Sequence, residues 1–259
     1  MRFTEGRGVL VKIFTNLGAC APLHQRHRYL APVSAPPLSA GPDPATPLAT
    51  LPFAVVDVET TGTVPENGDR ITEIAVVRVH GGIVGAQYAR LINPQRTIPG
   101  YISALTGISN AMVRDEPPFR DRAPEIRSLL DGAVFTAHNA AFDWRFVQAE
   151  LVRSAVAPLD GPRLCTVRMA RLFLPQLPRR SLDAVTTHFG IGIAARHRAA
   201  GDALATAHAL CRLLALATDA GLTTWGALEA YLAPRARRRI IPPVRSRLPL
   251  PPHAEDRPA

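Results

Sequence analysis

The chain alternates between short apolar runs rich in β-branched residues and longer stretches in which apolar positions recur with helical spacing. The apolar runs predict strands near residues 53–58, 72–80, 83–92 and 133–136. His80-Gly81-Gly82 predicts a tight hairpin, which makes the second strand antiparallel to its neighbours. Helical spacing, with Ser181 as an N-cap and Gly190 just past the end of that helix, predicts helices near residues 120–130, 140–155, 166–173, 181–189, 202–218 and 222–231. This order of elements predicts an α/β domain built on a mixed sheet.

The first predicted strand ends in two acids that a buried strand does not ordinarily carry. Asp57 and Glu59 are two residues apart, so their side chains point to the same face of the strand. Their charges repel each other, and burial raises the free energy of each ionised form. A pair of hard oxygen ligands suits a divalent cation such as Mg²⁺, which would neutralise them. On these residues alone, a half-exposed strand end whose acids face water explains the pattern equally well.

Three further polar residues stand at or before the beginnings of predicted helices. Asp143 lies in the first turn of a helix that leaves the fourth strand, with Phe142 and Phe146 on its apolar face. His197 precedes by five residues Asp202, which opens a long helix rich in Ala and Leu. Taken singly, Asp143 is explained as a partner of the helix dipole, Asp202 as a helix cap and His197 as a surface histidine. As an ordered set with the two acids of the first strand, they are harder to attribute to local structure.

In this order the residues resemble the three motifs of the DEDDh-type 3′–5′ exonuclease superfamily. The motifs read DVETTG around Asp57 and Glu59, HNAAFD ending at Asp143, and HRAAGDALAT containing His197 and Asp202. The resemblance runs from about residue 51 to residue 232 and includes RITEIA at 70–75, LTGI at 105–108, LCT at 164–166 and SLD at 181–183. It is greatest with the proofreading epsilon subunit of bacterial DNA polymerase III and its stand-alone relatives.

The resemblance implies both a fold and a mechanism. The fold would be the RNase H-like exonuclease fold of the α/β class, with a mixed five-stranded sheet that contains one antiparallel strand and is flanked by helices. Two divalent cations, Mg²⁺ or Mn²⁺, would bind the scissile phosphate. Asp57, Glu59 and Asp202 would hold one cation, and Asp57 would share the other with Asp143. His197 would be the general base, a task that its unperturbed pKa of about 6.5 suits. The expected reaction releases nucleoside 5′-monophosphates from the 3′ end of DNA, in proofreading or repair.

The same resemblance implies where the substrate binds. The backbone at Thr60, Thr61 and Gly62 would hold the sugar of the terminal nucleotide, and Leu105 and Phe142 would contact its base. From the residues alone, Phe142 is explained equally well as a core aromatic. The expected partners are nucleic acid 3′ ends, single-stranded DNA foremost, and a DNA polymerase if the chain serves in proofreading. Two alternatives stay open: an RNA-trimming 3′–5′ exoribonuclease with the same site, and a noncatalytic polymerase-accessory subunit.

Composition fits a soluble enzyme of a reducing compartment. The chain has 259 residues, 47% of them hydrophobic, and no stretch approaches the about 20 apolar residues that a membrane helix needs, so no membrane partner is expected. Its three cysteines lie far apart, which excludes a zinc-finger spacing and argues against a disulfide framework. Residues 1–22 weakly resemble a secretion signal, but Lys12 and Asn16 interrupt the apolar part. We therefore expect a cytoplasmic protein.

The net charge of +9 comes mainly from the two ends of the chain. Residues 1–51 carry five basic and two acidic side chains and residues 233–259 carry seven and two, whereas residues 52–232 carry 18 and 17. The Pro- and Ala-rich segment before residue 52 and the Arg- and Pro-rich segment after residue 232 predict unfolded extensions of an exonuclease domain at 52–232. The C-terminal arm would add salt-sensitive affinity for nucleic acid, or serve only as a solubilising tail. Six arginines would line either a phosphate track or a solvated surface: Arg168, Arg171, Arg179, Arg180, Arg196 and Arg198.

Overall fold

The computed structural model describes residues 41–233, which are built around a five-stranded sheet. The strands are β1 (Phe53–Thr60), β2 (Ile71–His80), β3 (Ile83–Leu91), β4 (Val134–Ala137) and β5 (Arg163–Cys165). Their order across the sheet is β3-β2-β1-β4-β5. β2 pairs antiparallel with both β1 and β3, whereas β1, β4 and β5 pair in parallel. The prediction of a mixed five-stranded sheet with one antiparallel strand is confirmed.

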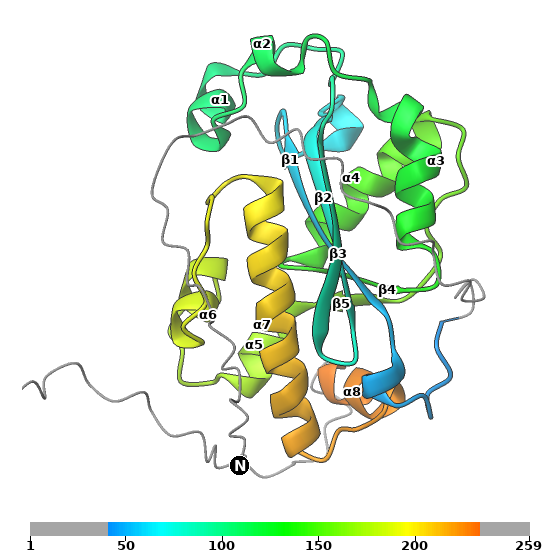
Figure 1. Ribbon diagram of the computed structural model, residues 1–259, viewed down its shortest axis with the longest axis vertical. Coiled ribbons are helices and arrows are strands. Elements are labelled where there is room, and N and C mark those ends of the chain that lie inside the picture. Colours follow the sequence, from blue (N-terminus) through cyan, green and yellow to red (C-terminus); the bar gives the residue numbers. More distant parts are fainter. Residues whose placement is uncertain (1–40, 234–259) are drawn as a thin grey trace, which may run out of the picture. The chain divides into compact units, whose positions relative to one another are not determined.

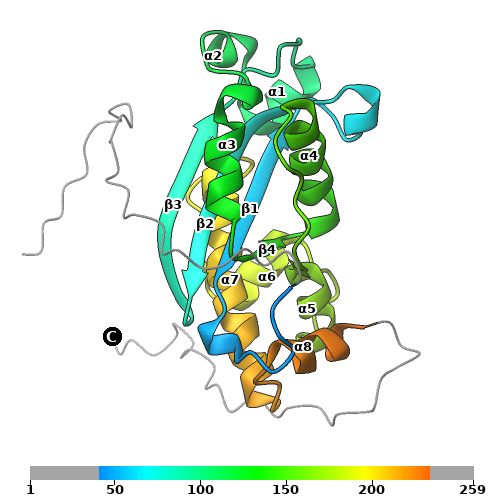
Figure 2. The ribbon, with the colours of Figure 1, turned by 90° about the vertical axis from the view of Figure 1, so that its right-hand side faces the viewer.

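Helices cover both faces of this sheet (Figures 1 and 2). One face packs against α3 (Phe119–Leu130) and α4 (Ala140–Arg153). The other face packs against α5 (Thr166–Phe173), α6 (Leu182–His188), α7 (Ala199–Asp219) and α8 (Trp225–Leu232). Two short helices, α1 (Gly100–Thr106) and α2 (Asn110–Val113), lie at the end of the sheet where β1 ends and α7 begins. Two 3₁₀ turns complete the described elements: η1 (Leu48–Thr50) and η2 (Pro65–Asn67).

The alternation of side chains along β1 divides the interior into two cores. Ala54 and Val56 pack with α3 and α4, whereas Phe53 and Val55 pack with α5, α7 and α8. Because residues two apart share a face of a strand, Asp57 continues the series of Phe53 and Val55. The acids at the end of β1 therefore belong to the face that α7 covers.

Most predicted elements form close to their predicted bounds, and the cap residues act as expected. The Ser181 hydroxyl accepts a hydrogen bond from the Ala184 N–H at 3.4 Å, and Gly190 has a φ of +66° just past α6. Among the α-helices and strands, three short elements were not predicted, namely α1, α2 and β5. With only seven, four and three residues, they are too short to show a clear period.

The packed structure begins earlier than the boundary that we expected near residue 51. Leu48 and Leu51 are buried in the core beneath α7. The Leu48 N–H donates to the Thr223 carbonyl at 2.8 Å, and the Gly226 N–H donates to the Pro44 carbonyl at 2.8 Å. Residues 44–51 are thus part of the packed domain rather than of an unfolded extension. The expectations for residues 1–40, which include the weak secretion-like signal, and for residues 234–259 lie outside the described residues.

Helix α7 is more apolar than the sequence expectation allowed. Among residues 41–233 it is the one helix whose length and composition would let it cross a membrane, with a mean hydropathy of 1.2 over its most apolar window. However, 56% of that window is buried inside the domain, where α7 packs across β1, β2 and β3. A largely buried core helix passes the same test, so this finding is weak support for a membrane span.

Candidate active site

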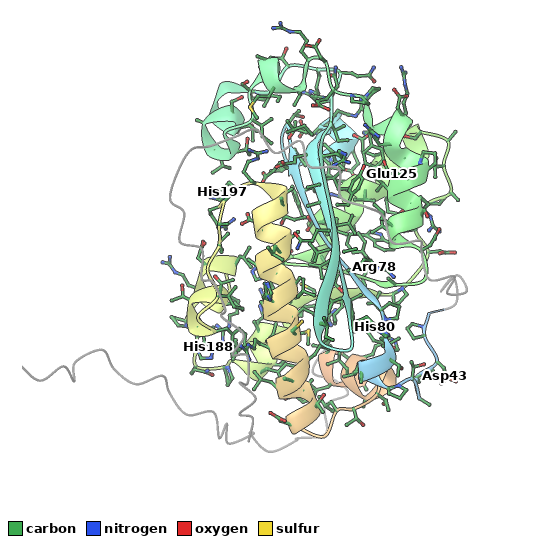
Figure 3. The ribbon with its side chains drawn as sticks, in the orientation of Figure 1. Asp43, Arg78, His80, Glu125, His188 and His197 are labelled. Atoms are coloured by element: carbon green, nitrogen blue, oxygen red, sulfur yellow. The ribbon has the colours of Figure 1, made fainter. Side chains whose placement is uncertain are left out.

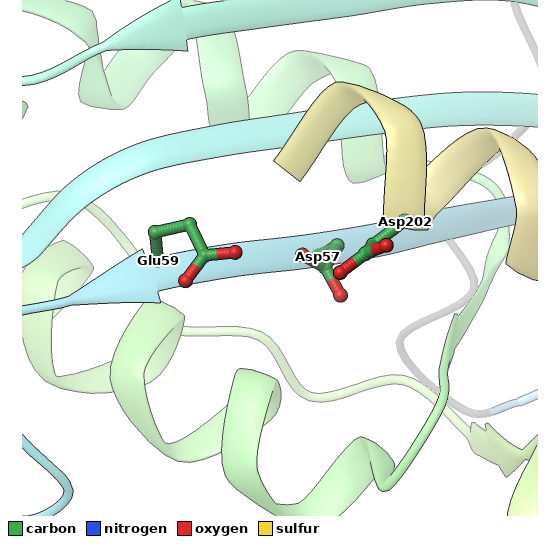
Figure 4. A group of neighbouring side chains, drawn as sticks. All are labelled: Asp57, Glu59 and Asp202. Atoms are coloured by element: carbon green, nitrogen blue, oxygen red, sulfur yellow. The ribbon is translucent and has the colours of Figure 1, made fainter. Parts of the chain in front are cut away.

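Three carboxylates from two distant parts of the chain converge where β1 ends and α7 begins. Asp57 and Glu59 come from β1, and Asp202 comes from the first turn of α7. One side-chain oxygen of each lies within 4.8 Å of the others, and the three side chains point into one space (Figure 4). The predicted grouping of these three acids is therefore present in the fold. Asp202 lies far from the other two acids in sequence, and it reaches them because α7 packs directly on β1 and β2.

Asp143 adjoins this group but is held differently. It lies in the first turn of α4, is 4% exposed, and its Oδ1 accepts a hydrogen bond from the Val58 N–H at 3.2 Å. Asp143 is not one of the three residues whose ligand atoms lie within 4.8 Å of one another. Its charge nevertheless makes the largest contribution of any neighbouring acid to raising the pKa of Asp57, after burial itself. The fourth predicted acid is therefore electrostatically coupled to the group.

Burial and mutual repulsion make these carboxyl groups unusually weak acids. Burial, followed by the charges of Asp143 and Glu59, raises the pKa of Asp57 well above its usual range. Burial and the charge of Asp202 raise the pKa of Glu59 to about 7. Burial raises the pKa of Asp143 to about 8, although the hydrogen bond from Val58 opposes the shift. The cluster is therefore short of positive charge when ionised.

Asp202 is held through one of its two oxygens only. Its Oδ2 accepts hydrogen bonds from the His197 N–H at 3.2 Å and from the Arg196 guanidinium. Its Oδ1 is buried and has no hydrogen-bond partner among the described residues. An unpartnered buried carboxylate oxygen is costly unless a cation or water meets it. One oxygen each of Asp57, Glu59 and Asp202 forms a donor set of the kind that Mg²⁺ and Mn²⁺ prefer, so these residues fit the expected cation.

The start of α7 is fixed to the sheet by Glu73 of β2. Glu73 is directly opposite Glu59 in the β1–β2 ladder and is 4% exposed. Its carboxylate receives hydrogen bonds from Arg198 Nη2 at 2.7 Å and Nε at 3.0 Å, and from the Ala199 N–H at 2.9 Å. A carboxylate that caps a helix N-terminus also interacts favourably with the helix dipole. Glu73 therefore sets the position from which Asp202 reaches β1.

His197 lies in the turn that leads into α7 (Figure 3). Its backbone is left-handed, with a φ of 58°, and its side chain is half-buried. The imidazole lies near enough to Asp183 and Asp202 to act on both: it adds to the lowering of the Asp183 pKa and opposes the rise that burial causes in the Asp202 pKa. By contrast, His80 at the β2–β3 hairpin and His188 at the end of α6 lie toward the other end of the domain. Among these three histidines, His197 is the one beside the carboxylate group.

The loop after β1 is tightly bonded within itself. The Thr60 hydroxyl donates to the Gly62 carbonyl at 2.5 Å, and the Thr61 hydroxyl donates to Asp69 at 3.2 Å. A side chain at Gly62 would collide with the Asp69 carboxylate, which would have to move away from its hydrogen bonds with Thr61 and Val64. Both threonine side chains are thus engaged inside the protein. The expected contact of this loop with a sugar stays a prediction and would have to use mainly the backbone.

The two expected base contacts differ in exposure. Leu105 on α1 is 54% exposed, although it is a large apolar side chain. Phe142 on α4 is half-buried, and its ring packs on Phe146 with 5.0 Å between centroids. Phe142 is therefore partly a core residue, as the alternative held, while part of its surface stays accessible. Their contact with a nucleotide stays a prediction.

The six arginines singled out in the sequence do not form one free basic surface. Arg196 pairs with Asp183 and Asp202, and Arg198 pairs with Glu73. Arg168 donates to the backbone carbonyl of Leu232. Arg180 donates to the backbone carbonyls of Pro175 and Pro178. Most of these charges are therefore committed to contacts inside the domain.

Sequence reasoning did not identify the residues that hold Asp202 and α7 in place. Glu73, Asp183 and Arg196 each contact the site or its supports. One sequence signal pointed to Glu73, because an acid within the apolar run from Ile71 to Val79 needs a partner when buried. Arg196 and Asp183 gave no such signal, since both occur in polar segments.

Comparison with known proteins places the chain in a family. Residues 54–210 match the exonuclease family (RNase T), and this range contains all five predicted catalytic residues. The match covers more than half of the chain, and the chain therefore belongs to the exonuclease family. The relatives and solved structures agree with this assignment.

Two curated relatives are each 41% identical to the chain. One is the DNA polymerase III subunit epsilon-like protein of Rhodobacter capsulatus, aligned over 71% of this chain and 26% of its own length. The other is the 3′-5′ exonuclease DinG of Bacillus subtilis, aligned over 60% of this chain and 16% of its own length. The chain thus spans about a quarter or less of these relatives. Among solved structures, Exonuclease X in complex with 5′ overhanging duplex DNA is 27% identical, with a TM-score of 0.55, over 68% of this chain and 98% of its own.

Proposed function

We propose that the protein is a DEDDh-type 3′–5′ exonuclease that hydrolyses DNA from its 3′ end and releases nucleoside 5′-monophosphates. The observation that carries this proposal is the convergence of Asp57, Glu59 and Asp202, with Asp143 beside them, in a chain of the exonuclease family. A domain that only bound nucleic acid would gain nothing from four acids in one place, because they repel phosphate. The site therefore favours catalysis over a purely binding role.

The acids would hold two divalent cations, Mg²⁺ or Mn²⁺. Asp57, Glu59 and Asp202 would hold one, and Asp57 and Asp143 would support the other. When bound, the cations would neutralise the charge of the scissile phosphate and lower the pKa of the attacking water. The buried and unpartnered Oδ1 of Asp202 supports this assignment.

His197 would act as the general base. Its side chain is half-buried beside the carboxylate group, so it is open to water and near the acids. An imidazole can take a proton from the attacking water near neutral pH and then release it to solvent. The leaving group would be the 3′-oxygen of the penultimate nucleotide, and no covalent intermediate with the protein is required.

DNA is the proposed substrate. The base of its terminal nucleotide would contact the surface around Leu105 and Phe142. Relatives of the chain carry names from DNA polymerase III, and the solved Exonuclease X is in complex with DNA. An exposed leucine and a half-exposed phenylalanine offer apolar contact to any base, so this grip would be independent of sequence. We propose a role in proofreading or repair, with a DNA polymerase as the partner that proofreading would require, and a cytoplasmic location.

The test uses single-stranded DNA labelled at its 5′ end and an RNA of the same sequence. Each is incubated with the protein in Mg²⁺, in Mn²⁺ and in chelator, beside the Asp57→Asn variant as an inactive control. We expect a ladder that shortens from the 3′ end of DNA, requires the cation and is absent in the variant. Thermal unfolding of both proteins checks that the variant is folded.

Each other outcome selects a different conclusion. Faster shortening of the RNA ladder would replace DNA by RNA as the substrate and leave the mechanism in place. Equal cleavage by wild type and Asp57→Asn would overturn the metal assignment. Absence of cleavage of either substrate by a folded protein that binds both would support the noncatalytic accessory role instead.

A further inference from the structure

Asp202 is oriented by a second residue pair that lies outside the four acids. Arg196 stands in the turn before α7 and donates through Nη1 to Asp202 Oδ2. The same guanidinium donates through Nε to Asp183 Oδ1 at 2.7 Å and through Nη2 to Asp183 Oδ2 at 3.4 Å. Asp183 lies in the first turn of α6. One planar guanidinium therefore links the beginnings of α6 and α7.

This arrangement leaves one oxygen of Asp202 for a ligand and occupies the other. Two donors, Arg196 and the His197 N–H, meet at Oδ2, whereas Oδ1 is buried and has no hydrogen-bond partner in the described part of the chain. One oxygen of this carboxylate lies within 4.8 Å of oxygens of Asp57 and Glu59. The side chain of Asp202 is 5% exposed, so solvent has little access to reorient it. A carboxylate fixed in this way can offer one defined oxygen to a cation.

We propose that Arg196 is a positioning residue for the metal site, with Asp183 as its anchor. Together they hold Oδ2 of Asp202 so that Oδ1 faces the divalent cation that Asp57 and Glu59 share. This inference rests on the proposed function, because it requires that the three acids bind a cation. It adds two residues, on α6 and on the turn before α7, to those that determine cation affinity.

Two opposite physical effects would follow from removing Arg196. Loss of its positive charge would favour a nearby cation, whereas loss of its hydrogen bond would free Asp202 to rotate. The charge of Arg196 is largely offset by Asp183, because the guanidinium of Arg196 donates to both carboxylate oxygens of Asp183. Groups that orient metal ligands typically account for about 10- to 100-fold in metal affinity. Because Asp183 already offsets the charge of Arg196, we expect the orienting effect to be the larger of the two.

The experiment measures Mn²⁺ binding by isothermal titration calorimetry, on the full chain without nucleic acid. Asp183→Asn keeps the charge of Arg196 but weakens its anchor, and Arg196→Lys keeps the charge but loses the planar fork. Arg196→Ala removes both. Arg212→Ala is the matched control, because Arg212 lies exposed on α7 and loses the same charge away from the site.

We expect the Kd for Mn²⁺ to rise about tenfold or more in Asp183→Asn, Arg196→Lys and Arg196→Ala, and to stay unchanged in Arg212→Ala. Asp183 has a 61% exposed side chain, so its substitution leaves the core intact and the variant should fold. Cleavage by Asp183→Asn should return toward the wild-type rate at saturating Mn²⁺, which a variant that failed for structural reasons would not do.

The results separate this inference from the proposed function. If wild type binds Mn²⁺ and Arg196→Lys matches it while Arg196→Ala binds more tightly, Arg196 acts by charge alone and the positioning role is overturned. If Asp183→Asn binds Mn²⁺ with wild-type affinity, the proposed role of Asp183 as the anchor of Arg196 is likewise overturned. If wild type itself binds no Mn²⁺, the metal assignment of the proposed function fails first.

Discussion

At the scale of single residues, the candidate site brings together carboxylates that repel one another. Asp57, Glu59 and Asp202 lie close together, and the pKa of each is raised, first by burial. Such a group lowers the stability of the cation-free fold, because ionised acids in a buried place repel one another. Such destabilising groups cluster at functional sites. A cation, if it binds as proposed, would supply the missing charge.

Removing one of these charges should therefore stabilise the protein while abolishing cleavage. In chelator, Asp57→Asn should raise the melting temperature by about 2–4 °C, the shift that ~1 kcal/mol produces in a domain of 150–250 residues. Asp160→Asn serves as the control, since Asp160 is exposed and outside the group. A melting temperature below that of wild type would show that Asp57 stabilises the fold rather than straining it.

The role of His197 should appear in the chemical step and not in binding. Its left-handed backbone tolerates asparagine well, so His197→Asn keeps the turn and removes the base. We expect kcat to fall about 10²- to 10⁴-fold with unchanged Mn²⁺ affinity, and the pH–rate profile to lose its lower limb. His208→Asn, at an exposed position of α7, is the control. A variant profile identical to that of wild type would exclude His197 as the base.

The exposed leucine on α1 should affect substrate affinity alone. Leu105→Ala should raise KM for single-stranded DNA about tenfold, which corresponds to the burial of one apolar side chain in the complex. Val152→Ala removes an apolar side chain that is 64% exposed on α4 and should change nothing. Steady-state kinetics of the two variants make the comparison. Equal KM values would show that Leu105 does not touch the nucleotide.

At the scale of elements, the turn between α6 and α7 is the feature that local patterns described least well. The sequence predicted that this helix begins near residue 202, but α7 begins at Ala199. Its first N–H is capped by Glu73, which is 126 residues away along the chain. No pattern near residue 199 could reveal that partner. By contrast, α6 begins as predicted because its cap, Ser181, is local.

Gly201 offers a test of how closely this turn packs on α7. In an isolated helix, alanine is more favourable than glycine by about 1 kcal/mol. Here a side chain at Gly201 would collide with the Ala195 carbonyl, in the turn that carries Arg196 and His197. We therefore expect Gly201→Ala to lower both the melting temperature and the Mn²⁺ affinity, measured by differential scanning and titration calorimetry.

The control for this variant is Gly192→Ala, because a side chain at Gly192 meets no atom within 4 Å. A stabilised Gly201→Ala variant with normal Mn²⁺ affinity would mean that the turn yields freely and does not fix the site.

At the scale of the whole molecule, the acids couple stability to pH. In the folded state the pKa is about 7 for Glu59 and about 8 for Asp143, whereas the ordinary values are 4.5 and 3.8. Between the ordinary and the raised values, the folded state binds more protons than the unfolded state. Stability of the cation-free protein should therefore fall as pH rises from about 4 to about 8.

This prediction is checked by chemical denaturation in chelator across that pH range. The slope should diminish in Glu59→Gln, which cannot titrate, and also in saturating Mn²⁺, which would compete with protons for the same oxygens. Glu229→Gln, on α8 and far from the cluster in sequence, should keep the wild-type slope. If the free energy of unfolding changes with pH by the same slope with and without Mn²⁺, the pH dependence does not arise from this site.

The sequence by itself determined where the acids of the candidate site lie within their own strands and helices. Period-two alternation placed Asp57 and Glu59 on one face of β1, and helical spacing placed Asp143 and Asp202 in the first turns of their helices. The order of strands and helices also predicted the mixed sheet. These features follow from local geometry, which a short stretch of chain contains in full.

Only the tertiary structure decided how these groups are held and which atoms stay free. The hydrogen bond from Val58 to Asp143 spans 85 residues and that from Ala199 to Glu73 spans 126. Such contacts depend on strand order and on the packing of α4 and α7 against the sheet, which no local pattern contains. Within residues 41–233, that packing and the turn before α7 leave Oδ1 of Asp202 unpartnered and commit Arg196 to Oδ2.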